Sequence, residues 1–155
     1  MRTAPTGCLS LLMFGLVLAL PFLLANAVPT ALAGYQVARI ALQAPSTLFA
    51  LGAALVLNVG LCYSFATPVP QQGIAMQPLI PAGAAALSGL VLAPAWAPPV
   101  AFATGVLGPL IGADLLHLGD IADIGTGMAS IGGAGTFDGV VLSGLVATLL
   151  VPGAL

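Results

Sequence analysis

The sequence predicts an all-α fold: a polytopic bundle of about five transmembrane helices in a single domain, residues 1–155. Hydrophobic residues make up 60% of the chain and charged residues only 4%, whereas soluble domains carry about 25% charged residues. Long apolar runs alternate with short segments rich in proline and glycine, which are typical of turns. A helix needs about 20 apolar residues to cross a bilayer. We therefore expect an integral membrane protein.

The N-terminal part contains one predicted span and one more polar segment. Residues 9–28 form the first span. Arg2 before this run and the Ala-Asn-Ala sequence at 25–27 also resemble a signal peptide, but we expect the segment to be retained as a span or signal anchor. Residues 29–44 carry Arg39, and a charge at the middle of a bilayer costs about 3 kcal/mol. We predict a short interfacial helix at 29–44, with six spans in total if it crosses.

Four further apolar runs complete the predicted bundle, and the segments between them are short. Trp96 lies in one of these turns, which suits the aromatic belt at a membrane surface. Because the chain has only two Lys or Arg residues, its orientation in the membrane is not predicted. The short connections leave no room for an extramembrane domain. The predicted spans are residues 47–66, 74–92, 99–118 and 128–151.

Small residues at intervals of four predict how the last two spans pack. Such residues let transmembrane helices approach closely. We expect the two rows to face each other, because the spans are joined by a short loop and must be antiparallel neighbours. The rows are Thr104, Gly108 and Gly112 in one span, and Gly135, Gly139, Ser143 and Ala147 in the other.

The titratable groups concentrate in residues 114–138, which hold the only histidine, His117, and every acidic residue. Asp114 and Asp138 are the main candidates for a site, because a carboxylate in hydrocarbon must be paired, hydrated or protonated. Three glycines within residues 132–135 predict a broken helix before Asp138. Asp120 and Asp123 are expected to face water.

Three stretches resemble a bacterial and archaeal family of integral membrane proteins known only as domain of unknown function 1614. They are residues 68–81 (PVPQQGIAMQPLIP), 105–117 (GVLGPLIGADLLH) and 129–139 (ASIGGAGTFDG). The resemblance extends over about residues 68–147. It implies a multi-pass fold in the inner (plasma) membrane of a prokaryote, and it brings no established activity.

Three functions are compatible with these features. The first is a non-catalytic accessory or structural subunit packed against a larger membrane complex, with Arg39, Trp96 and the apolar surface in contact with the partner. The second is an ion or proton pathway through Asp114, His117 and Asp138. The third is an intramembrane aspartyl-type hydrolase in which Asp114 and Asp138 share a proton.

The first of these functions requires the least chemistry, so we expect a protein that is not an enzyme. Asp114 and His117 alone are too few ligands for a metal ion, so we predict no metal and no cofactor. Its partners are the lipid bilayer and other membrane subunits. Nucleic acid is not expected, because the chain has no basic patch, and no soluble substrate is identified.

Overall fold

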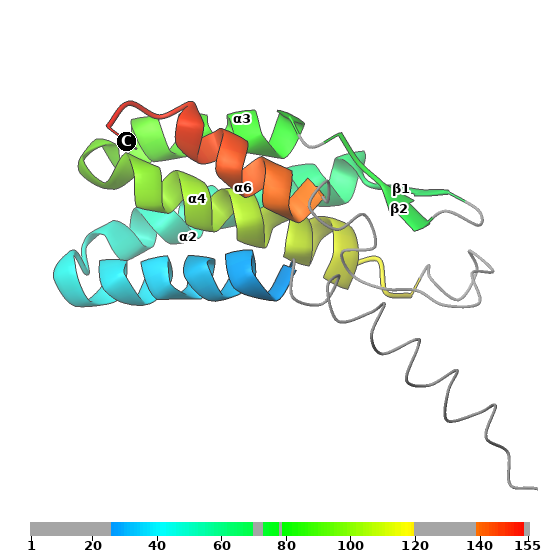
Figure 1. The fold of residues 1–155 in the computed structure, drawn as a ribbon, viewed down its shortest axis with the longest axis horizontal. Coiled ribbons are helices and arrows are strands. Elements are labelled where there is room, and N and C mark those ends of the chain that lie inside the picture. Colours follow the sequence, from blue (N-terminus) through cyan, green and yellow to red (C-terminus); the bar gives the residue numbers. More distant parts are fainter. Residues whose placement is uncertain (1–25, 70–72, 78, 120–138, 154–155) are drawn as a thin grey trace, which may run out of the picture.

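The computed structural model describes residues 26–69, 73–77, 79–119 and 139–153, and most of these are helical (Figure 1). Residues 26–43 form the first described helix, here named the 26–43 helix. The elements that follow are α2 (Thr47–Phe65), β1 (Thr67–Val69), β2 (Gly73–Ala75), α3 (Leu79–Leu92), the 3₁₀ turn η1 (Pro94–Trp96), α4 (Ala97–Pro109), the π-helix η2 (Leu110–Leu115) and α6 (Gly139–Leu149).

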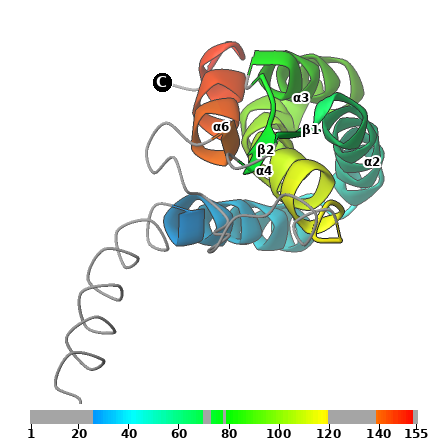
Figure 2. The same ribbon diagram turned by 90° about the vertical axis from the view of Figure 1, so that its right-hand side faces the viewer.

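Helix α4 lies at the centre of the bundle. Viewed end-on in Figure 2, it is surrounded by α2, α3, α6 and the 26–43 helix. One core cluster joins Ala33 and Ile40 of the 26–43 helix to Val100 and Val106 of α4, and all four are fully buried. A second cluster, between α3, α4 and α6, consists almost entirely of alanine. These small side chains let the helices approach closely.

Two helices among the described residues are long and apolar enough to cross a membrane. They are α2, with 19 residues, and the continuous helix Pro94–Leu115, with 22 residues. Both overlap predicted spans, 47–66 and 99–118. A five-span bundle is not established, because α3 is shorter, and residues 9–25 and 128–138 of two other predicted spans lie outside the described residues.

The predicted span at 74–92 begins too early. Ile74 and Ala75 belong to β2, which pairs with β1 in an antiparallel hairpin with Ile74 opposite Pro68. The helix begins only at Leu79 and spans 14 residues. Pro81 fits in its first turn, where an N–H has no partner within the helix. Apolar composition alone did not distinguish the strand from the helix.

The segment predicted as a short interfacial helix at 29–44 is longer and packs along the bundle. The 26–43 helix is about 27 Å long at 1.5 Å per residue, and it runs obliquely along one side of α4 (Figures 1 and 2). Ala33, Val37 and Ile40 face the core at helical spacing. Pro45 separates this helix from α2.

The two predicted rows of small residues do not face each other throughout. A Cβ atom built on Gly108 would lie 2.9 Å from Cγ of Asn58, in α2, and one built on Gly112 would lie 2.7 Å from Cβ of Cys62, also in α2. Gly105 instead meets α6, 3.0 Å from the Ser143 carbonyl oxygen. Gly105 and Gly108 lie about 60° apart around the helix axis, so Gly105 contacts α6 while Gly108 contacts α2.

Candidate functional site

Asp114, one of the two predicted site carboxylates, lies at the end of the bundle that carries the β-hairpin. Asp114 is in η2 and is half-buried. It lines a small cavity of about 70 Å³ together with Met76, which follows β2, and Gly139, at the start of α6. This volume has room for water or a small ion, and not for an organic substrate.

A π-helix positions Asp114. The N–H of Leu116 donates to the carbonyl oxygen of Ile111 at 2.9 Å, five residues earlier. Pro109 precedes the π-helix and has no N–H to donate. Within the π-helix, Gly112 brings its backbone against Val59 and Cys62 of α2. Such single turns of π-helix are rare and often occur at functional sites.

His117 is buried and contacts the same π-helix. Its Nδ1 lies 3.1 Å from the carbonyl oxygen of Gly112. A carbonyl only accepts, so Nδ1 carries the proton. The imidazole also packs on Tyr63, with ring centroids 4.8 Å apart. His117 therefore joins the end of η2 to α2.

The remaining predicted site residues are only partly described. Asp138 and Gly135 lie outside the described residues, as do Asp120 and Asp123, so a pairing of Asp114 with Asp138 stays a prediction. Ser143 is fully buried in α6. Within the described ranges, no three His, Cys, Asp or Glu side chains gather closely enough to hold a metal ion.

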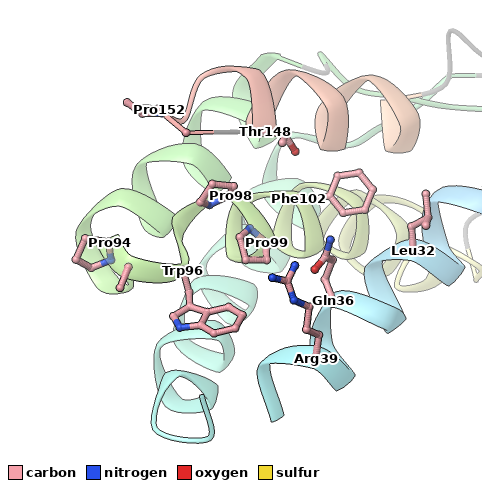
Figure 3. Close-up of a pocket in the computed structure, with 12 residues that line it drawn as sticks. Leu32, Gln36, Arg39, Pro94, Trp96, Pro98, Pro99, Phe102, Thr148 and Pro152 are labelled. Atoms are coloured by element: carbon pink, nitrogen blue, oxygen red, sulfur yellow. The ribbon is translucent and has the colours of Figure 1, made fainter. Parts of the chain in front are cut away.

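A larger cavity lies at the opposite end of the bundle, between the 26–43 helix and α6 (Figure 3). Its volume is about 670 Å³. Leu32, Gln36 and Arg39 form one wall, the η1 turn and the start of α4 form the floor, and Thr148 lies on the other side. We name it the Arg39 cleft.

Arg39 and Trp96 form the polar end of this cleft. The guanidinium carbon lies 5.4 Å from the centroid of the Trp96 ring, within the range of a cation–π contact. Nε donates a long hydrogen bond of 3.5 Å to Oε1 of Gln43. The side-chain oxygen of Gln36 is buried, and it has no hydrogen-bond partner.

The family model described as protein of unknown function DUF1614 matches residues 25–150. The chain belongs to the DUF1614 family. This match confirms the predicted resemblance and extends it toward the N-terminus, across the 26–43 helix and α2. No curated protein and no solved structure matches this DUF1614 protein.

The Arg39 cleft was not predicted. Arg39 and Trp96 were each expected to contact a partner protein, but 57 positions separate them in the sequence. One signal was available: Leu32, Gln36 and Arg39 recur at intervals of four and three, so they share a face of one helix. Which element covers that face is visible only in the folded chain.

Proposed function

We propose that this DUF1614 protein is a multi-pass protein of the inner (plasma) membrane of a prokaryote, and that it serves as a non-catalytic subunit packed against a larger membrane complex. The observation that carries the proposal is the large number of apolar side chains exposed on the outer surface of the described bundle.

The outer surface of the described bundle is apolar on several helices. Leu42 is 85% exposed, Phe49 87% and Val56 72%, and many other large aliphatic side chains point outward. By contrast, Asn58 and Thr104 are fully buried. Soluble monomers rarely expose contiguous apolar patches larger than a few hundred Å². Lipid suits this surface better than water does.

The length of α3 supports packing against a partner. Its 14 residues extend about 21 Å at 1.5 Å per residue, whereas the hydrocarbon core of a bilayer is about 30 Å thick. A helix that is too short accommodates by thinning the bilayer or by associating with other helices. Leu87 and Val91 leave an apolar outer face on α3. We infer that this face contacts the larger complex.

Purification in mild detergent from the native membrane is expected to recover the chain with at least one other membrane protein. Alkaline carbonate should leave it in the membrane pellet. Changing Leu87 and Val91 together to Ala should reduce recovery of the partner on the order of tenfold, because about 1–2 kcal/mol of contact is lost. Val56→Ala with Leu57→Ala, on the outer face of α2, is the matched control. Migration as a single small monomer would refute the subunit proposal.

An ion or proton pathway is a second candidate, because Asp114 is among the residues that line a cavity of about 70 Å³ between the hairpin and α6. An ionisable group within a membrane bundle commonly marks such a pathway. In proteoliposomes, this function predicts a proton flux that Asp114→Asn abolishes and Asp114→Glu partly retains, since only Glu keeps the titratable group. A wild-type protein without flux under an imposed pH gradient argues against the pathway.

A further inference from the structure

We propose that the Arg39 cleft binds one anionic phospholipid, with the phosphate on Arg39 and the start of an acyl chain along Leu32 and Phe102. The inference rests on the proposed membrane location. It adds a ligand and a site that do not depend on which protein the chain associates with.

The charge of Arg39 indicates an anionic ligand. It is the only Lys or Arg among the described residues, and none of the described carboxylates pairs with it. Asp114, the single acidic residue in those ranges, lies at the other end of α4 and η2. A guanidinium matches phosphate oxygens with two parallel hydrogen bonds. A phosphate at this end of the bundle would balance the charge.

The order of the lining side chains matches the order of groups in a phospholipid. Arg39 and Trp96 lie near the end of the bundle, and indole rings favour the level of lipid headgroups. Gln36 lies one turn deeper, where its unpartnered oxygen accepts a hydrogen bond from water that enters with the lipid, because phosphate and ester oxygens are themselves acceptors. Leu32 lies about 10 Å beyond Arg39 along the helix, and it lines the cleft together with Phe102.

The walls favour a lipid over a free anion. Pro98 and Pro99 occupy the first turn of α4, so two positions that commonly donate N–H groups to anions have none. Arg39 is then the one charged donor at the cleft within the described residues, and much of the remaining lining is apolar. The volume of about 670 Å³ lies within the range of about 300–1,000 Å³ typical of ligand pockets.

Trp96 reports directly on the site, because it is the only tryptophan of the chain. The full chain is incorporated into phosphatidylcholine vesicles that contain a small, equal fraction of either brominated phosphatidylglycerol or brominated phosphatidylcholine. Bromine quenches indole fluorescence at short range. We expect the anionic lipid to quench Trp96 more strongly. Arg39→Gln should weaken this preference on the order of tenfold, the equivalent of one charge-assisted hydrogen bond.

Two further variants separate the cleft from a general attraction of anionic lipid to Arg39. Leu32→Phe keeps the charge but narrows the cleft, so the preference should fall. Gln43→Ala removes a contact of Arg39 outside the cleft lining, so the preference should persist. Circular dichroism of each variant checks that the helices are intact.

The outcomes distinguish the two proposals. Equal quenching by both lipids in the wild-type chain, or a preference unchanged in Leu32→Phe, overturns the lipid site and leaves the membrane location standing. If inorganic phosphate in the buffer abolishes the preference for the anionic lipid, the cleft binds a free anion. That result also overturns the lipid site. A chain that fails to enter the vesicles contradicts the membrane location itself.

Discussion

Replacing Gly112 with alanine is expected to destabilise the bundle by about 2–3 kcal/mol, the upper part of the usual range for overpacking a well-packed contact. A Cβ atom at this position would meet the carbonyl oxygen of Val59, and it would lie 2.7 Å from Cβ of Cys62 and 3.1 Å from the backbone nitrogen of Tyr63. Two of these three atoms belong to the backbone of α2. They cannot move away by a change of rotamer, so α2 and η2 must separate.

The measurement is thermal or denaturant unfolding in detergent micelles, followed by circular dichroism. Gly60→Ala, on α2, is the matched control, because nothing lies within 4 Å of the added methyl group. In that position alanine should be neutral or stabilise the helix by up to about 1 kcal/mol. Equal unfolding midpoints for the two variants would contradict the close contact between η2 and α2 at Gly112.

The second large effect is a coupling between Gly108 and Asn58. The side-chain amide of Asn58 donates from Nδ2 to the carbonyl oxygen of Thr104 at 2.9 Å and holds α2 to α4. A methyl group on Gly108 would lie 2.9 Å from Cγ of Asn58, so Gly108→Ala must displace the amide. Asn58→Ala removes the same hydrogen bond and also makes room for the methyl group.

The loss of unfolding free energy in the double variant should therefore be about 1–2 kcal/mol smaller than the sum of the losses in the two single variants. The four proteins of this cycle are compared by the same unfolding measurement. Gly83→Ala, whose added methyl group meets nothing within 4 Å, is combined with Asn58→Ala as a control that should be additive. Additivity in the Gly108 cycle would mean that the two side chains do not share one space between α2 and α4.

Some parts of this fold were accessible from local sequence. The helix α2 begins at Thr47, the predicted position, because Pro45 interrupts the preceding helix and an unbroken apolar run follows. The start of α3 was not accessible in this way. Ile74 and Ala75 are as apolar as the helix that follows, and they form a strand because Pro68 and its neighbours are positioned to pair with them.

The candidate sites were likewise predictable from the sequence only in part. The cluster at Asp114 and His117 was visible in the sequence, since ionisable residues are rare in this chain and these two are close together. The hydrogen bond from His117 to the Gly112 carbonyl depends on the π-helix. The Arg39 cleft joins residues from the 26–43 helix, the η1 turn, α4 and the end of α6, so no single stretch of sequence contains it.

By itself, the sequence determined the family and the predominantly helical class of the chain. Family motifs are local strings, and apolar composition is sufficient to predict helices that could span a bilayer. The tertiary structure alone decided which neighbour each glycine of α4 faces, where the hairpin replaces a helix, and which end of the bundle holds the larger cavity. These features depend on the rotation of each helix and on its neighbours, and packing between distant segments determines both.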